Sequence, residues 1–160
     1  MTRLRAVALA VLLTGGFATP AFADITGFIG ANTTPKNRHT QGFAVGMGLL
    51  FIGLEFEYSS TPDDPASLAP ALNTGMGNVL FQAPFAIYGF QPYATTGAGV
   101  YHESLESFEK TGFGLNLGGG VKISLVGPVR LRIDYRVFNL GDGALQSPVH
   151  RIYVGLNLKF

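Results

Sequence analysis

The sequence predicts an all-β fold, an eight-stranded antiparallel up-and-down transmembrane β-barrel, and three observations support this prediction. Beyond residue 24 the chain alternates between strand-like stretches and turn-forming stretches, and no segment shows the 3.6-residue period of a helix. The composition is 47% hydrophobic and only 13% charged, more apolar than a soluble surface needs. After the first twenty-odd residues, however, no run of about 18 apolar residues occurs that could form a transmembrane helix. The apolar residues must therefore be spread over strands.

The N-terminal 23 residues have the pattern of a secretory signal peptide. Arg3 and Arg5 form a basic start, residues 6–13 an apolar run, and Ala21-Phe22-Ala23 a small-x-small cleavage site. The alternative interpretation is a short buried helix. Cleavage before Asp24 makes residues 1–23 the signal peptide and residues 24–160 a single barrel domain, since the remaining length suits one domain.

The charge and cysteine content narrow the classes of partner. Without its leader the chain keeps 9 basic residues against 10 acidic ones, a formal charge of −1. A nearly neutral chain gives no reason to expect nucleic acid as a partner. The absence of cysteine excludes disulfides and thiolate metal sites, and it also excludes a lipid-anchored lipoprotein.

Eight segments of the chain have the alternation and composition of strands. We predict them over residues 25–33, 42–51, 53–60, 75–83, 91–102, 111–124, 129–139 and 150–160. An even number of strands of about ten residues each suits a closed barrel that crosses a bilayer with tilted strands.

The connections between these segments alternate in length. Those after the second, fourth and sixth strands are compact, over 51–53, 84–90 and 125–128. Those after the first, third, fifth and seventh are longer or more polar, over 34–41, 61–74, 103–110 and 140–149. Short turns face the periplasm in bacterial barrels and longer loops face outside, so we expect both termini in the periplasm.

The two faces of the predicted strands differ in polarity. In residues 129–139, Val129, Leu131, Ile133, Tyr135 and Val137 lie on the face opposite Arg130, Arg132, Asp134 and Arg136. In a soluble sandwich, which is the alternative, the charged face would be solvated. Here the polar faces consist mainly of Gly, Asn, Ser and Thr with few charges, which suits a narrow lumen. An open sheet would leave unpaired backbone groups in lipid, whereas closure pairs them all.

Several motifs resemble one family. They are Gln91-Pro92-Tyr93, Gly97-Ala98-Gly99, Leu117-Gly118-Gly119-Gly120-Val121 and residues 131–136, followed by a fully alternating segment that ends on Phe160. Together they resemble the small eight-stranded barrels of the Gram-negative outer membrane, a superfamily that includes the OmpA transmembrane domain, OmpX and the opacity-type proteins. The resemblance implies location in the cell outer membrane but transfers no activity, because one fold serves many functions. The sequence departs from full OmpA, whose barrel is followed by a periplasmic peptidoglycan-binding domain, so we do not carry over an expectation of tethering to the cell wall.

The resemblance also gives a role to the last strand. Its outward set would be the C-terminal insertion signal that the barrel-assembly machinery recognises: Ile152, Val154, Leu156, Leu158 and Phe160.

Charged residues on the inward positions form the first candidate site. They are Glu55, Glu57, Lys122, Arg130, Arg132, Asp134, Arg136, Arg151 and Lys159. An ion-selective path is one interpretation, and its basic surplus would favour anions. We favour a paired network that fills the lumen, because eight strands leave an interior just wide enough for side chains.

A second candidate site is catalytic. His102 and Ser104 lie two apart on a strand end and therefore share a face, and a His base beside a Ser hydroxyl is the minimum for attack on an ester. The pair resembles the His-x-Ser of the lipid A deacylase PagL, but Leu105-Glu106 stands where that motif has Asn-Ala. His39 and His150 are isolated, so we expect no metal site.

We therefore predict a non-enzymatic, OmpA-like outer-membrane barrel with a role in envelope integrity or surface interaction through its loops. The alternatives are a PagL-like lipid A esterase and a narrow porin for small solutes. We expect no cofactor, a monomer, and outer-membrane lipid and lipopolysaccharide as surroundings.

Overall fold

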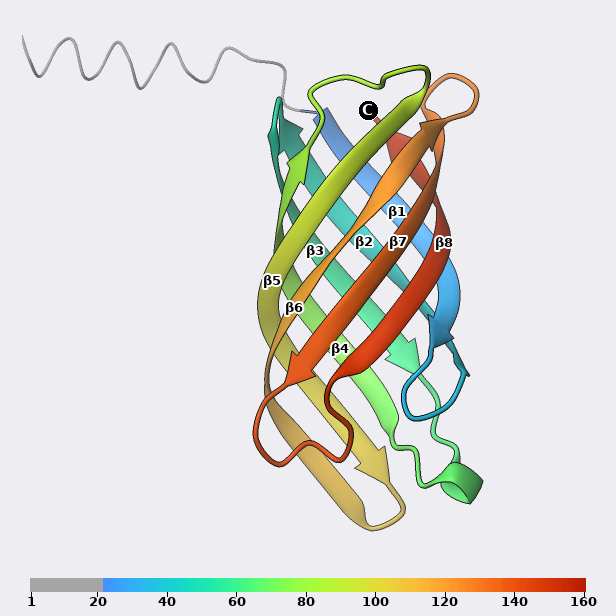
Figure 1. The fold of residues 1–160 in the computed structure, drawn as a ribbon, viewed down its shortest axis with the longest axis vertical. Helices are drawn as coiled ribbons and strands as arrows, with labels where there is room; N and C mark the ends of the chain where they lie inside the picture. The colour runs from blue at the N-terminus through green and yellow to red at the C-terminus, as the bar shows by residue number, and fades with distance from the viewer. Residues whose placement is uncertain (1–21) are drawn as a thin grey trace, which may run out of the picture.

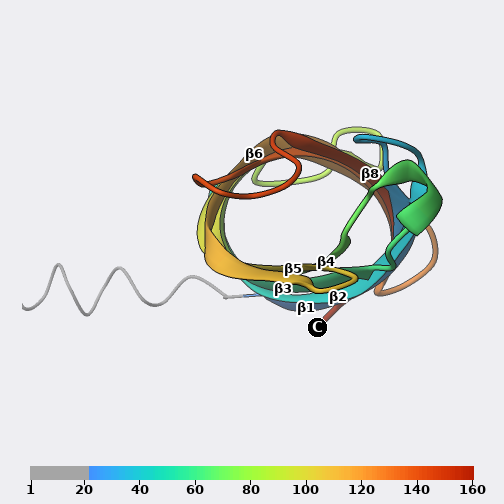
Figure 2. The same cartoon turned by 90° about the horizontal axis from the view of Figure 1, so that it is seen from below.

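The protein is a closed barrel of eight antiparallel strands, in which each strand pairs with its sequence neighbours and the last pairs with the first. This computed structural model describes residues 22–160. Figure 1 shows the strands tilted around one axis, and Figure 2 shows the ring they form when seen along it. The predicted all-β, eight-stranded, up-and-down architecture is confirmed.

The strands are ten to seventeen residues long. They are β1 (Phe22–Asn32), β2 (Arg38–Leu49), β3 (Ile52–Thr61), β4 (Ala71–Gln82), β5 (Phe90–Leu105), β6 (Phe108–Ser124), β7 (Val129–Leu140) and β8 (Val149–Lys159). A single turn of 3₁₀-helix, η1 (Pro65–Ser67), lies between β3 and β4. None of the helical structure within residues 22–160 is long and apolar enough to cross a membrane.

The pairing of β1 with β8 closes the barrel. The two strands run antiparallel in a register that places Ile29 opposite Val154, and the ladder continues to the last residue, where Ala23 and Phe160 exchange two backbone hydrogen bonds of 3.0 and 2.9 Å. Closure leaves no strand with a free row of backbone donors and acceptors. The sheet can therefore present an apolar outer surface without unpaired polar backbone.

The two ends of the barrel differ in their connections. One end, which we call the terminal end, carries both ends of the described chain and the connections 50–51, 83–89 and 125–128 (Figure 1, top). The other, the loop end, carries the connections 33–37, 62–70, 106–107 and 141–148 (Figure 1, bottom). Three of the four connections at the loop end are five residues or longer.

The strands extend further than the sequence predicted. β1 begins at Phe22 instead of residue 25, and β2 begins at Arg38 instead of residue 42. The predicted loop 103–110 is wrong, because β5 and β6 continue through most of it and leave only Glu106-Ser107 as a turn. Glu106 takes a positive φ of 52° there, which suits a tight hairpin. The charged residues at these strand ends suggested loops. In the barrel, however, their backbone is paired in the sheet and their side chains can point into the polar interior.

The outward and inward faces have opposite polarity. Large apolar side chains on the outward face are 40% or more exposed, among them Ile25, Ile29, Phe43, Val45, Met47, Leu54, Phe56, Phe113, Leu115, Leu117, Ile133, Tyr135, Ile152, Val154, Leu156 and Leu158. The inward face holds buried threonines, asparagines and most of the buried charges. A soluble sheet would have the reverse arrangement, so this barrel is built for an apolar solvent.

Residues 1–21, which contain most of the predicted signal peptide, lie outside the described residues. Phe22 and Ala23, the last two residues of that prediction, form the start of β1 and pair with Gly48 and Met47 of β2.

Candidate functional site

Six charged side chains meet in the middle of the lumen. We call them the central network: Glu55 and Glu57 of β3, Arg132, Asp134 and Arg136 of β7, and Arg151 of β8. All six are 5% exposed or less. They come from both sides of the barrel, because β3 lies across the lumen from β7 and β8 (Figure 1). The alternation of each strand places every second residue inward, which brings these charges into one layer.

Each arginine of the central network contacts at least one carboxylate. Arg132 forms ion pairs with Glu55 and, at 3.2 Å, with Asp134. Arg136 lies 2.9 Å from both Glu55 and Asp134, and 3.2 Å from Glu57. Arg151 pairs with Glu57 and donates a hydrogen bond of 2.6 Å to Ser59 Oγ. Three positive and three negative groups therefore neutralise one another.

This pairing is what makes the charges tolerable inside the barrel. An ion taken out of water costs several kcal/mol even after relaxation, and only close pairing with further hydrogen bonds offsets that cost. Removing one partner of such a pair costs about 3 to 5 kcal/mol, because the other charge stays buried. Each charge of the central network is therefore stabilised by the others, and the loss of one destabilises those that remain.

Aromatic rings complete the layer. The Tyr93 hydroxyl donates to Asp134 and accepts a 2.7 Å hydrogen bond from Arg132 Nε. The Arg132 guanidinium lies 4.9 Å from the centre of the Tyr93 ring and 5.6 Å from that of Tyr153, distances typical of cation–π contacts. Tyr153 stacks on Phe28 with ring centres 4.1 Å apart. These rings leave little of the lumen cross-section open.

Two glycines of β6 give these groups their room. A Cβ on Gly118 would lie 2.8 Å from Arg136 Cγ, and a Cβ on Gly120 would lie 2.6 Å from the Tyr93 hydroxyl oxygen. The Gly118-Gly119-Gly120 run therefore serves close packing inside a strand, a role that glycine has where another group approaches the backbone.

The lumen at the loop end is apolar. Six buried residues form a cluster that we call the apolar layer: Leu72, Met76, Tyr101, Phe138, Leu140 and Val149, with Ala144 of the connection 141–148 packed against it. Beyond this layer, Arg38 donates hydrogen bonds to the carbonyls of Pro62 and Pro70, and Glu103 accepts one of 2.8 Å from the Leu145 amide. These two side chains attach the connections 62–70 and 141–148 to the barrel wall.

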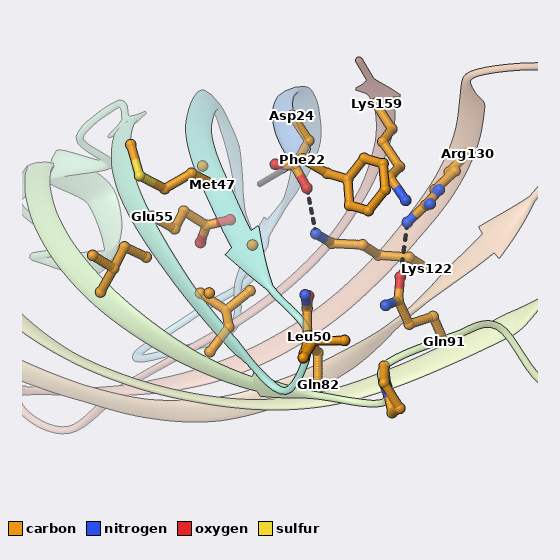
Figure 3. Close-up of a pocket in the computed structure, with 16 residues that line it drawn as sticks. Phe22, Asp24, Met47, Leu50, Glu55, Gln82, Gln91, Lys122, Arg130 and Lys159 are labelled. Carbon is orange, nitrogen blue, oxygen red and sulfur yellow. Dashed lines mark hydrogen bonds and ion pairs between the residues drawn. The ribbon is translucent and has the colours of Figure 1, made fainter. Parts of the chain in front are cut away.

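The lumen at the terminal end is a charged cavity. It has a volume of about 110 Å³, and we call it the vestibule. Asp24, Lys122, Arg130 and Lys159 line it, together with Gln82 and Gln91 (Figure 3). Lys122 binds Asp24 at 2.6 Å, and Arg130 donates a 2.7 Å hydrogen bond to Gln91 Oε1. The Lys159 ammonium lies 3.4 Å from the centre of the Phe22 ring.

The nine charged residues singled out in the sequence fall into two separate layers. Glu55, Glu57, Arg132, Asp134, Arg136 and Arg151 form the central network, whereas Lys122, Arg130 and Lys159 lie in the vestibule. The basic surplus that would favour anions along an ion path is therefore absent from the middle of the barrel. It is confined to the terminal end.

Sequence reasoning missed five groups of the lumen. Asp24, Arg38 and Glu103 stood just outside the predicted strands, and the longer strands bring them inside. Extending the predicted strand 42–51 by four residues would have found Arg38, and extending 91–102 by one residue would have found Glu103. Tyr93 and Tyr153 looked like ordinary strand aromatics, and only the three-dimensional packing shows that their hydroxyls or rings contact the arginines.

The candidate catalytic pair is not assembled. His102 and Ser104 lie on the outward positions of β5 near the loop end, and His102 Nδ1 forms a 2.8 Å hydrogen bond with Thr111 Oγ1. No hydrogen bond joins His102 to Ser104 in the described part of the chain. His150 contacts the Tyr135 hydroxyl at 2.6 Å, and His39 is exposed. Residues 22–160 contain no group of three or more His, Asp or Glu side chains placed to hold a metal ion.

The residues of the predicted insertion signal form one exposed row. Ile152, Val154, Leu156, Leu158 and Phe160 all point outward, and each is 43% or more exposed.

With this geometry in place, the class of the fold is clear. No protein-family model matches the chain, and a search of curated proteins finds no match. Solved structures do match, and they are small eight-stranded outer-membrane β-barrels. The chain therefore has the fold of that class, and the resemblance seen in the sequence is confirmed at the level of structure.

Three particular structures illustrate the likeness. The N-terminal β-barrel domain of OprF from Pseudomonas aeruginosa matches with a TM-score of 0.71 at 14% identity, over 88% of this chain and 100% of that one. Neisserial surface protein A, NspA, matches with a TM-score of 0.65 at 16% identity, over 88% and 96%. Ail, the attachment invasion locus protein of Yersinia pestis, matches with 0.55 at 13% identity, over 89% and 100%. At such identities the likeness concerns the fold alone.

Proposed function

We propose that the chain is an integral, non-enzymatic protein of the bacterial outer membrane that supports envelope integrity or surface interaction through its loop end. Two observations support the membrane location. The outward face carries a continuous set of exposed apolar side chains, and the fold is that of outer-membrane barrels. Outer-membrane lipid and lipopolysaccharide would then surround a single copy of the barrel.

The filled lumen is the observation that carries this proposal. Arg132, Arg136 and Glu57 have 0% exposed surface, and the apolar layer lies between them and the loop end. A conducting pore needs mobile water and charges that an ion can replace, whereas here each arginine of the central network is engaged by carboxylates. The arrangement supports a structural role for the lumen. We therefore propose that contacts with other molecules are made by the surface of the barrel.

We infer the orientation from the two longest connections of the barrel. Single-chain outer-membrane barrels have short periplasmic turns and longer extracellular loops. The connections 62–70 and 141–148 both lie at the loop end, which we therefore place outside the cell. Both termini then lie in the periplasm, where the barrel-assembly machinery would bind the C-terminal strand during insertion.

The loop end has the composition of a polar contact surface. Its four connections contain Asp63, Asp64, Glu106 and Asp142 against a single basic residue, Lys36. The match to Ail includes a structure with a heparin analogue, sucrose octasulfate, which is an anion. An acidic surface repels such a ligand, so we do not extend heparin-type binding to this chain. The acidic loops favour a cationic partner instead.

A deletion strain examined in two ways tests the proposal. We expect increased permeability of the outer membrane or loss of a surface contact, and restoration by the full chain but not by a chain with 62–70 and 141–148 replaced by Gly-Ser linkers. Conductance of the purified protein in planar bilayers should stay at the background of protein-free membranes. Stable channels, or restoration by the linker variant, would contradict the proposal.

The same strain distinguishes the proposed non-enzymatic function from the enzymatic alternative. Ester hydrolysis by His102 and Ser104 would change the mass of lipid A when the protein is expressed. We expect identical lipid A mass spectra with and without the protein, and also with the Ser104→Ala variant. A mass shift that Ser104→Ala abolishes would identify an esterase.

A further inference from the structure

The vestibule holds positive charge that its surroundings leave unneutralised. It brings together Lys122, Arg130 and Lys159 against one carboxylate, Asp24, which lies 2.6 Å from Lys122. Among residues 22–160, neither Arg130 nor Lys159 forms an ion pair. Glu55 lines the inner end of the cavity, but both its oxygens are engaged by arginines of the central network. The vestibule therefore carries a net charge of about two positive units, in contrast to the neutral central network beside it.

The geometry of the cavity suits a small anion with several oxygens. Gln91 Oε1 accepts a hydrogen bond from Arg130 Nη1, which holds the guanidinium at the cavity wall while leaving its other donors free. Figure 3 shows the charged ends of Arg130 and Lys159 on one side of the cavity and the Lys122 ammonium directed at Asp24, with Gln82 below them in this view. Arginine offers a planar fork of donors, lysine a point charge, and glutamine an amide donor. A tetrahedral oxyanion can use all three at once.

The size and lining of the cavity also favour binding of a small oxyanion. A volume of about 110 Å³ can hold one small oxyanion or several water molecules. The remaining wall includes the buried side chain of Leu80 and the glycines Gly46, Gly48 and Gly53, which offer no polar side chain. Such walls reduce the local dielectric and strengthen the attraction of the cations for an anion.

We propose that the vestibule is a binding site for a phosphate-class oxyanion, formed by Arg130 and Lys159 with support from Lys122 and Gln82. The two uncompensated positive charges match the charge of a phosphate monoester or of hydrogen phosphate. The same chemistry is present in a phospholipid headgroup at the membrane surface and in a free phosphate, and the test below separates these sources.

Removal of the predicted leader would open the site further. The Phe22 ring covers the Lys159 ammonium in the described chain. Cleavage before Asp24 takes this ring away and leaves a new α-amino group beside the cavity. Both changes would increase the positive potential at the vestibule.

Binding is tested on folded protein purified after export. One arm titrates inorganic phosphate into the protein in a zwitterionic detergent at constant ionic strength, with chloride as the reference anion. It follows the side-chain amide NMR signal of Gln91 and the backbone amide signals of Asp24 and Lys122, which line the vestibule and are kept in every variant. The other arm places the protein in nanodiscs of phosphatidylcholine that contain phosphatidic acid, and measures the phosphatidic acid retained by native mass spectrometry.

Three variants make the test specific. Arg130→Gln with Lys159→Gln removes the two free cations, and Gln82→Glu adds a carboxylate to the cavity while keeping both cations. Lys36→Gln with Lys110→Gln removes two cations at the loop end and is the matched control. A shift in gel mobility on boiling confirms that each variant is folded.

We expect phosphate, phosphatidic acid or both to bind the unchanged protein, and binding to weaken at least about tenfold in the first two variants, which corresponds to about 1.4 kcal/mol. The control should bind within about twofold of the unchanged protein. Phosphate binding in detergent identifies a free anion as a ligand, and retention of phosphatidic acid alone identifies the headgroup. Binding of neither, or equal weakening in the control, would overturn the proposal. Either result leaves the function proposed for the loop end untouched, because that function uses the other end of the barrel.

Discussion

The central network and the vestibule are both charged layers of one lumen, yet the charges are balanced in the first and unbalanced in the second. In the central network three arginines meet three carboxylates, and all six side chains are 5% exposed or less. In the vestibule three basic side chains meet Asp24 alone, around a cavity of about 110 Å³. The layers are adjacent along β7, where Arg130 and Arg132 point into different layers although only one residue separates them.

This difference teaches that pairing depends on access to water. A charge in the middle of the barrel is not hydrated, so it needs a partner of opposite sign. A charge at the mouth keeps part of its hydration and can remain unpaired or bind a ligand. The four predictions that follow test this comparison, from the largest expected effect to the smallest.

Glu57→Gln should be the most damaging change in the lumen. Glu57 is the one carboxylate that Arg151 contacts within residues 22–160, so the substitution leaves a buried arginine without an acidic partner. We expect a loss of about 3 to 5 kcal/mol of unfolding free energy, measured by urea titration in lipid bilayers with the gel mobility shift as the readout. Stability equal to that of the unchanged protein would show that water reaches the central network.

Ile133→Arg tests the outward face at the level of the central network. Ile133 lies outward on β7 between the inward Arg132 and Asp134, and a charge placed there near the middle of the bilayer costs about 2 to 4 kcal/mol. Val126→Arg is the matched control, because Val126 lies in a turn at the terminal end and is 80% exposed. It should cost about 1 kcal/mol or less. Equal tolerance of arginine at both positions in a bilayer would contradict the assignment of faces.

The same substitution at Arg132 and Arg130 compares the two layers directly. Arg132→Gln removes ion pairs with Glu55 and Asp134, although both carboxylates keep Arg136, and should cost about 1.5 to 3 kcal/mol. Arg130→Gln removes a partly exposed cation bound to neutral Gln91, and should stay within about 0.5 kcal/mol. Urea titration of both variants in one lipid mixture measures the difference. A larger loss at Arg130 would reverse our account of the layers.

Deletion of Phe160 should have only a small effect on the folded protein. The ring lies on the outward face at the terminal end and is 68% exposed, so its loss removes at most about 1.5 kcal/mol of apolar burial. We expect refolding in detergent to be nearly unchanged, whereas cell fractionation should show a sharply reduced level in the outer membrane. Normal assembly in cells would mean that Phe160 is not part of an insertion signal.

Local patterns were sufficient for the architecture. The alternation over residues 129–139 and 150–160 predicted both the strands and the side chains that point inward, because the two-residue period of a strand is a property of the backbone itself. The alternation of strand-like stretches with turn-forming stretches also predicted eight strands. The ends of the strands were less certain, and β1, β2, β5 and β6 all proved longer.

The sequence by itself therefore determined the class of fold, the polarity of each face and nine of the charged residues of the lumen. Only the tertiary structure decided which of these charges meet. Strand tilt and stagger bring Glu57 of β3 to Arg136 and Arg151 on the far wall, and they bring Asp24 to Lys122, 98 residues away. Contacts across a barrel depend on the register of all eight strands together, and no local pattern contains that register.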